Sequence, residues 1–166
     1  MNIVDSSGWL AYFADEPNAK YFLPPLKDTA SLVVPTVTIY EVFRVVLRES
    51  NENEALQAAV AMRKGKLVDL TSSLAIAASK LSMAHHLPMA DSIILATAKE
   101  FSATIWTQDS DFKDLDDVKY FPKKRVFFGS EVAPEPQVFA LRKSAQGCEK
   151  SMHAHVTVEV GRKNQS

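Results

Sequence analysis

Short apolar runs alternate with longer amphipathic segments along residues 1–120. These runs, at residues 3–4, 32–34, 67–68, 103–107 and 118–120, are the predicted strands. The run at 32–34 has the continuous hydrophobicity of a buried strand, and the run at 118–120 is expected to be an edge strand. The segments between them carry apolar residues at three- and four-residue spacing, which predicts helices over residues 9–14, 18–26, 37–49, 52–63, 73–85 and 90–101. We expect Pro24 and Pro25 to break the second of these helices.

This alternation of strands and helices predicts an α/β fold with a mostly parallel sheet. Connections between its strands are expected to be right-handed crossovers. In such a sheet, ligands bind beyond the carboxyl ends of the strands, near the point where the strand order reverses. Polar residues directly after the predicted strands, or early in the helices that follow them, are therefore the candidates for function.

Four acidic residues occupy such positions. Asp5 ends the first predicted strand, and Asp109 follows the fourth. Glu41 lies in the first half of the third helix, and Asp91 lies in the first turn of the last one. Because the carboxyl ends of parallel strands meet at one edge of a sheet, all four carboxylates can share that edge.

Each acid also has an ordinary structural interpretation. Asp5 could cap the helix that follows it, Asp91 could complement a helix dipole, and Asp109 could belong to a turn. Glu41 could pair with Arg44 three residues further on. Taken together the acids favour another interpretation, because Glu41 interrupts a strongly apolar stretch and because four facing carboxylates repel one another.

A divalent cation would remove that repulsion. Oxygen ligands select hard ions such as Mg²⁺ or Mn²⁺. An ion of this kind lowers the pKa of a bound water and stabilises negative charge on a phosphate. The four acids therefore predict metal-dependent hydrolysis of a phosphodiester.

Four motifs that contain these acids resemble those of one known family. They are IVDSSGWLAY (residues 3–12), VPTVTIYEV (34–42), LPMADSIILATA (87–98) and IWTQDSDF (105–112). In residues, order and spacing they resemble the PIN-domain ribonucleases, and most closely the toxin component of VapBC-type toxin–antitoxin pairs. The resemblance covers residues 1–125, which we expect to form a PIN-like ribonuclease domain.

The resemblance implies a three-layer α/β/α sandwich around a mostly parallel sheet of four or five strands. It also implies that a quartet of acids binds Mg²⁺ (or Mn²⁺), namely Asp5, Glu41, Asp91 and Asp109. Ser6 and Thr107 match the small polar and hydroxyl residues that accompany the first and fourth acids. Asp111 matches a secondary position that is often acidic.

The activity implied is that of a Mg²⁺-dependent endoribonuclease that cleaves cellular RNA (tRNA or rRNA) and is the toxin of a type II toxin–antitoxin pair. Its implied partners are a cognate antitoxin, the RNA substrate and a second copy of the chain in a homodimer. A catalytically silent PIN-like module that acts through an antitoxin-type partner is the alternative. A phosphotransfer receiver fits poorly because it needs paired acids early in the chain. A haloacid-dehalogenase-type phosphatase needs Asp-x-Asp after the first strand, where this chain has Asp5, Ser6 and Ser7.

Composition adds limits on the environment and on the partners. The chain of 166 residues has 19 Lys and Arg and 20 Asp and Glu, so its formal net charge is −1. Bulk charge therefore does not drive nucleic-acid binding, although two divalent ions would bring the formal balance to −1 + 4 = +3. A single cysteine, Cys148, excludes an intrachain disulfide. With neither a secretory signal nor an apolar stretch long enough for a membrane span, we expect a cytoplasmic protein.

Two basic clusters are the first candidates for phosphate contacts if RNA binds, although a solvated surface is the ordinary interpretation of both. One is at residues 63–66, and the other consists of Lys119, Lys123, Lys124 and Arg125. We expect neither cluster to be interleaved with aromatic rings in the manner of a stacking platform.

Residues 126–166 are expected to form an atypical C-terminal tail that has no counterpart in the family pattern. Poor order is one expectation for this tail, and a short helix at 136–145 with a strand at 156–160 is the other. The pair His153 and His155 lies here too, with too few neighbouring ligands for a metal site.

Overall fold

Residues 1–123 are described by the computed structural model, and their centre is a sheet of five parallel strands in the order β3-β2-β1-β4-β5. The strands are β1 (Asn2–Val4), β2 (Leu32–Pro35), β3 (Lys66–Val68), β4 (Thr104–Thr107) and β5 (Val118–Tyr120). Ile3 of the central strand pairs with Val33 on one side and with Ile105 on the other. Each predicted apolar run is therefore a strand of one parallel sheet.

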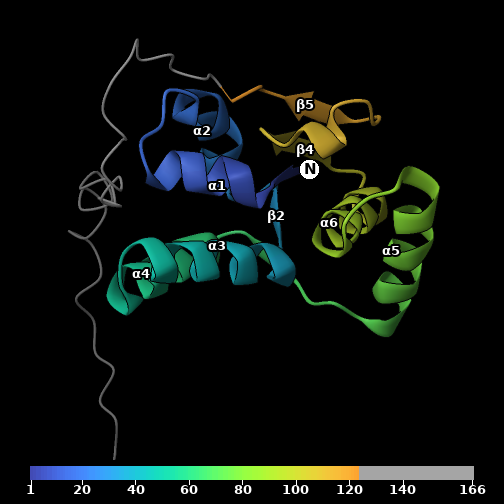
Figure 1. The fold of residues 1–166 in the computed structure, drawn as a ribbon, viewed down its shortest axis with the longest axis horizontal. Coiled ribbons are helices and arrows are strands. Elements are labelled where there is room, and N and C mark those ends of the chain that lie inside the picture. The colour runs from blue at the N-terminus through green and yellow to red at the C-terminus, as the bar shows by residue number, and fades with distance from the viewer. Residues whose placement is uncertain (124–166) are drawn as a thin grey trace, which may run out of the picture.

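Six α-helices cover the two faces of this sheet, so the predicted three-layer α/β/α sandwich is confirmed. Figure 1 shows α1 to α4 on one side and α5 with α6 on the other. The helices are α1 (Ser6–Phe13), α2 (Ala19–Lys27), α3 (Thr36–Glu49), α4 (Glu52–Met62), α5 (Ser72–His85) and α6 (Met89–Glu100). No helix within residues 1–123 is long and apolar enough to cross a membrane.

Side chains of the buried strands alternate between two cores. Val4 and Val34 pack with residues of α1 to α4, whereas Ile3, Val33 and Ile105 pack with residues of α6. This two-sided burial explains why the strands appear in the sequence as continuous apolar runs rather than as alternating patterns. It also fixes the register of the sheet, because a shift by one residue would exchange the two faces.

Three local expectations are corrected. Helix α1 begins at Ser6 rather than near Trp9, because the Asp5 side chain caps its first turn. Helix α2 continues through Pro24 and Pro25, since the fixed backbone angle of proline is helical and the buried Phe22 and Pro25 hold the segment in place. Helix α5 begins at Ser72 rather than at residue 73, because the hydroxyl of Thr71 caps it by accepting a hydrogen bond from the backbone N–H of Leu74.

The remaining expectations for the carboxyl-terminal part concern residues outside the described range. They include the basic residues Lys124 and Arg125, the tail at 126–166 and its two histidines. The division of the chain at residue 125 therefore stays a prediction.

Replacement of Gly8 by alanine tests the packing of α1 against the sheet. A Cβ at this position would lie 2.7 Å from Cγ1 of Val4 and 2.8 Å from the ring of Phe22. Although Gly→Ala normally favours a helix by up to about 1 kcal/mol, we expect Gly8→Ala to lower the free energy of unfolding by about 1–3 kcal/mol. Urea denaturation measures this change, with Ser79→Ala on the exposed surface of α5 as a control that shifts it by less than about 0.5 kcal/mol. A stabilised Gly8→Ala protein would contradict this close packing.

Candidate active site

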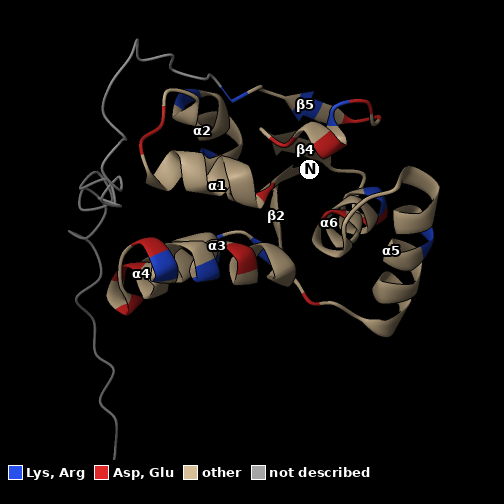
Figure 2. Cartoon of the chain, viewed as in Figure 1, with Lys and Arg blue, Asp and Glu red and all other residues tan. Residues whose placement is uncertain are grey.

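The candidate site lies where the strand order of the sheet reverses. Strands β1 and β4 are neighbours at this point, although about a hundred residues separate them along the chain. Asp5 directly follows β1, and Asp109 lies two residues after β4. Helix α3 contributes Glu41, and the first turn of α6 contributes Asp91. Figure 2 shows acidic positions on these four elements around the centre of the view.

Asp5 is the most enclosed of the four acids, with 2% of its surface exposed. One carboxylate oxygen accepts hydrogen bonds from the backbone N–H groups of Ser7 and, at 3.3 Å, of Gly8. The other accepts a hydrogen bond from the hydroxyl of Thr107. Burial raises the pKa of Asp5, and these hydrogen bonds oppose the rise because they favour the charged form. The helix-cap interpretation of Asp5 is therefore correct, and it is compatible with a role at the site.

Thr107 joins the first acid to the fourth. Its side chain is fully buried, and its Oγ1 accepts a hydrogen bond from the backbone N–H of Asp109 at 2.8 Å while it donates to Asp5. Asp109 in turn caps a short 3-10 helix, Ser110–Phe112, by accepting from the N–H of Asp111 at 3.0 Å. A single hydroxyl thus sets the positions of two acids that follow neighbouring strands.

A second layer of polar side chains, absent from the sequence-based expectations, holds this arrangement. The Ser7 hydroxyl lies 3.5 Å from the Thr107 hydroxyl and accepts a hydrogen bond from the backbone N–H of Gln108 at 2.9 Å. The amide of Gln108 donates to the Ser7 carbonyl at 3.1 Å and accepts from Asn18 at 2.7 Å. Asn18 also donates to the carbonyl of Pro122 at 3.0 Å. In the sequence, Ser7 and Gln108 could have been linked to the site only because they lie within two residues of Asp5 and Asp109. Nothing in the sequence links Asn18 to the site.

Glu41 faces the site from α3 without a cationic partner in the described part of the chain. The expected alternative, an ion pair with Arg44, is not formed there. Burial raises the pKa of Glu41, a hydrogen bond from Ser6 opposes the rise, and the nearby charges of Asp5 and Asp109 add to it. Its Oε2 is buried and has no hydrogen-bond partner. A buried carboxylate oxygen without a partner is costly, so the site has capacity for a further positive or hydrogen-donating group.

Asp91 combines burial with repulsion from the other acids. Burial raises its pKa to about 7, and the charges of Asp109, Glu41, Asp5 and Asp111 contribute in that order. Like charges hold one another in the protonated form when no counter-charge is near.

The donor set fits a hard divalent cation, although the side chains are not arranged around one. Within residues 1–123, no group of three or more acidic, histidine or cysteine side chains is arranged as a ready-made set of metal ligands. The donors are all carboxylate oxygens, one of which is buried without a partner, and their mutual repulsion raises the pKa of Asp91. Mg²⁺ and Mn²⁺ are the ions that such oxygen donors select.

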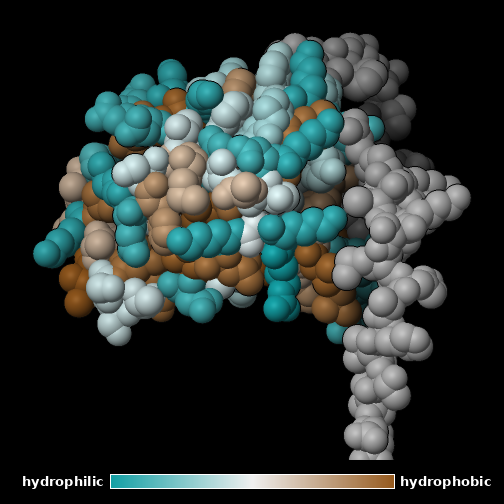
Figure 3. Space-filling model, turned by 180° about the vertical axis from the view of Figure 1, so that it is seen from behind, coloured by the Kyte–Doolittle hydropathy of each residue, from teal (hydrophilic) through white to brown (hydrophobic). Residues whose placement is uncertain are grey.

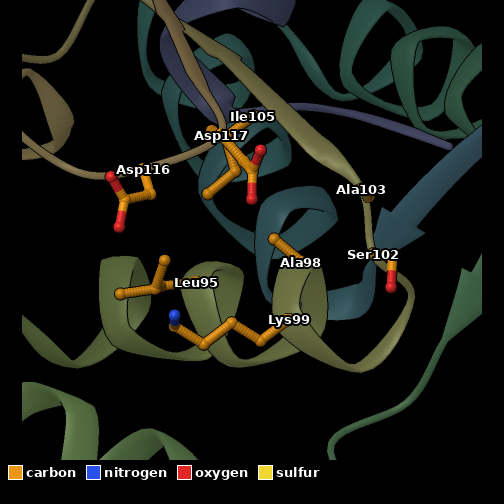
Figure 4. Close-up of a pocket in the computed structure, with 8 residues that line it drawn as sticks. All are labelled: Leu95, Ala98, Lys99, Ser102, Ala103, Ile105, Asp116 and Asp117. Atoms are coloured by element: carbon orange, nitrogen blue, oxygen red, sulfur yellow. The ribbon is translucent and has the colours of Figure 1, made fainter.

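Two pockets of similar size lie at opposite edges of the sheet. One, of about 310 Å³, adjoins the acids and is lined by Ser7, Leu10, Glu16, Gln108, Asp109, Ser110 and Lys123. The other, of about 300 Å³, precedes the amino ends of β4 and β5 and is lined by Leu95, Ala98, Lys99, Ser102, Ala103, Ile105, Asp116 and Asp117 (Figure 4). Only the first shares a residue with the four acids, so the second is not part of this site.

Comparison with known proteins identifies the family. Residues 3–118 match the PIN domain, and the chain belongs to this family. No curated protein shows significant sequence similarity to the chain.

Solved structures share its fold at low sequence identity. A toxin–antitoxin complex from Klebsiella pneumoniae is 19% identical, with a TM-score of 0.62 over 72% of this chain and 96% of that one. VapC20 of Mycobacterium tuberculosis, a sarcin–ricin loop cleaving toxin, is 16% identical, with a TM-score of 0.60 over 70% and 95%. VapBC2 of Rickettsia felis, bound to a DNA fragment from its promoter, is 11% identical, with a TM-score of 0.57 over 74% and 98%.

The raised pKa of Asp91 predicts how the stability of the metal-free protein depends on pH. The folded state keeps this carboxyl protonated up to about pH 7, whereas the unfolded chain loses the proton near the ordinary value of 3.8. The folded state thus binds more protons within this window, so its stability falls as the pH rises through it. We expect Asp91→Asn to flatten this decline in urea denaturation measured in the presence of a chelator.

Asp69→Asn is the matched control, because Asp69 is exposed and lies outside the site. It should leave the pH dependence of stability unchanged. Equal slopes for Asp91→Asn and the parent protein would show that Asp91 is not part of a repulsive cluster.

Proposed function

We propose that this protein is a metal-dependent endoribonuclease, the toxin of a type II toxin–antitoxin pair, and that it acts on cellular RNA in the cytoplasm. The observation that carries the proposal is the convergence of acids that follow β1 and β4 or lie on α3 and α6. Burial, together with the charges of the other acids, raises the pKa of Asp91 to about 7. Membership of the PIN domain family supports nuclease chemistry at this site. The description of VapC20 as a toxin that cleaves the sarcin–ricin loop supports RNA as the substrate. Ribosomal RNA or tRNA is the class of RNA in this proposal.

Each acid has a distinct role in this proposal. Asp5, Glu41 and Asp91 hold the main Mg²⁺ or Mn²⁺ ion, and Asp109 holds a second ion or orients the attacking water. When bound, the ion supplies a water of lowered pKa and positive charge beside the scissile phosphate.

The hydroxyl residues and Asp111 complete the proposed site. The hydrogen bond from Thr107 keeps one oxygen of Asp5 in position, and the hydroxyl of Ser6 favours the charged form of Glu41. Asp111 has a secondary role, because its charge adds to the field at Asp91 and its N–H orients Asp109.

Replacement of Asp91 by asparagine tests the catalytic proposal. The amide keeps the size of the side chain but removes a negative charge that would hold the cation. We expect Mg²⁺-dependent cleavage of total cellular RNA to fall by at least about a hundredfold, which is the scale of losing one charge-stabilising group in an active site. The same assay with Asp5→Ala should show a comparable loss, and the expressed variants should no longer arrest growth.

Asp69→Asn is again the matched control and should cut RNA at the parental rate. Undiminished cleavage by Asp5→Ala or Asp91→Asn would refute the proposed mechanism. Titration calorimetry with Mn²⁺ distinguishes the alternative: a protein that binds antitoxin normally but binds no metal is a silent module rather than a nuclease.

The proposal includes two protein partners. The Klebsiella pneumoniae structure is a toxin–antitoxin complex and that of Rickettsia felis contains VapBC2, which supports a cognate antitoxin for this chain. A homodimer is also proposed, and exposed apolar side chains on α5 and α6 support it, since Ile76, Met83 and Met89 are 60%, 79% and 76% exposed. Figure 3 shows apolar surface gathered between hydrophilic regions on the face seen from behind.

A charge on α5 tests the homodimer. Ile76 and Met83 are seven residues apart and therefore lie on one side of the helix. If this side is the dimer contact, Met83→Lys should shift the sedimentation coefficient at micromolar concentration from that of a dimer to that of a monomer. Gln57→Lys on α4 adds the same charge elsewhere and should not. A dimer unaffected by Met83→Lys would place the contact on another surface, and a parent protein that sediments as a monomer would refute the homodimer.

A further inference from the structure

Three aromatic rings from distant parts of the chain stack on one another beside β5, with a lysine at each end. We call the rings of Trp106, Phe121 and Tyr21 the aromatic ladder. The centroids of Trp106 and Phe121 are 5.9 Å apart, and those of Phe121 and Tyr21 are 4.8 Å apart with nearly parallel planes. The ammonium of Lys119 lies 4.1 Å from the centroid of Trp106, and that of Lys20 lies 5.1 Å from the centroid of Tyr21.

This arrangement corrects an expectation drawn from the sequence, namely that the basic cluster near residue 119 lacks interleaved aromatic rings. Phe121 lies between two lysines of that cluster, while β4 and α2 bring in Trp106 and Tyr21. All three rings are half-buried, and both flanking lysines are exposed. The indole N–H of Trp106 donates to the side chain of Asn2 at 2.9 Å, so this ring is held in a fixed orientation.

The aromatic ladder is continuous with the acidic site. The backbone N–H of Phe121 donates to the carbonyl of Thr107 at 2.9 Å, and Thr107 is the residue that joins Asp5 to Asp109. Two residues beyond Phe121, Lys123 forms an ion pair of 3.3 Å with Glu16 and lines the pocket that contains Asp109. Along the chain, Lys119, Phe121 and Lys123 are a cation, a ring and a cation that lead from β5 to the pocket containing Asp109.

The lysines favour the binding of a polyanion, and the aromatic rings favour one whose bases are unpaired. The acids repel RNA unless positive charge near them compensates, and the overall net charge of −1 supplies none. Stacked rings between cations are the surface that single-stranded nucleic acids use, because phosphates bind the cations and every base has a π-face. A base-paired substrate would present phosphates but no free base faces to the rings.

We propose that the aromatic ladder with Lys20, Lys119 and Lys123 binds single-stranded RNA on one side of the bond to be cut and positions it at the acids. The inference rests on the proposed nuclease function and goes beyond it by assigning a substrate path. Phosphates contact the lysines, and a base packs on the face of Trp106 that the exposed Lys119 covers in the free protein. These are positioning residues, so their replacement weakens binding without altering the chemical step.

The double variant Lys20→Gln, Lys119→Gln tests this in the full chain, and Lys80→Gln on α5 is the control. Binding to a labelled single-stranded RNA of about 12 nucleotides, within the size range of such sites, is measured by fluorescence anisotropy in the Asp91→Asn background. Removing two lysines that each bind a phosphate should make the slope of log K against log salt concentration shallower by about 1.4. We expect roughly tenfold weaker binding at low salt, little change with duplex RNA, and recovery with Lys20→Arg, Lys119→Arg.

Kinetics and fluorescence give independent readouts. With Asp91 intact, the double variant should raise KM and leave kcat unchanged, because uniform binding is what it removes. The chain has two tryptophans, and Trp9 is 3% exposed, so quenching on RNA binding should come from Trp106 and disappear in Trp106→Phe.

The failure of this inference differs from that of the proposed function. If the parent protein cuts RNA but the double variant binds and cuts like Lys80→Gln, the aromatic ladder is not a substrate path and the nuclease proposal stands. If the ladder variants lose RNA binding in a protein that never cuts RNA, the nuclease proposal fails, and of the inference only the RNA-binding surface stands. Weaker affinity for a protein partner with unchanged RNA binding would assign the surface to that partner and overturn the inference.

Discussion

The buried carboxylate of Asp5 is the constraint on which the rest of the site depends. A charged group with 2% exposure is tolerated only when hydrogen-bond donors surround it. The first turn of α1 supplies two backbone donors, and Thr107 at the end of β4 supplies a hydroxyl. Asp5 therefore sets where α1 begins and holds the ends of β1 and β4 together. The position of Asp109 follows, because its N–H donates to the same hydroxyl.

The fold places further acids near Asp5, although their proximity lowers the stability of the folded state. Burial raises the pKa of Asp5, and burial together with nearby like charges raises the pKa of Glu41 and of Asp91. Each rise means that the charged form destabilises the folded state, so the cluster opposes folding at neutral pH. Local destabilisation of this kind is common at functional sites and is compensated elsewhere. Here the two cores on either side of the sheet and the hydrogen bonds of Ser7, Gln108 and Asn18 hold the acids in place.

The parallel sheet explains why positive charge and aromatic surface lie so near these acids. Strand β5 pairs with β4, so the residues that follow both strands emerge at the same edge. After β4 the chain places Asp109 at the edge, and after β5 it places Phe121 and Lys123. Helix α2 then brings Tyr21 onto Phe121. A cluster of acids and a cation-flanked stack of rings thus share one edge of a domain whose net charge gives no sign of either.

The sequence by itself determined the strands, the fold class and the four acids. The inner strands β1 and β2 are buried and continuously apolar, whereas the outer strands β3 and β5 are short and partly exposed. The acids occupy positions just after strands or early in the next helix. Only the tertiary structure decided what surrounds the acids. Asn18 contacts Gln108 across 90 positions, Trp106 meets Tyr21 through Phe121, and α2 accepts two prolines because buried neighbours hold it. Contacts of this kind leave no periodic signal, because they depend on where separate elements meet in space rather than on the spacing of residues along one of them.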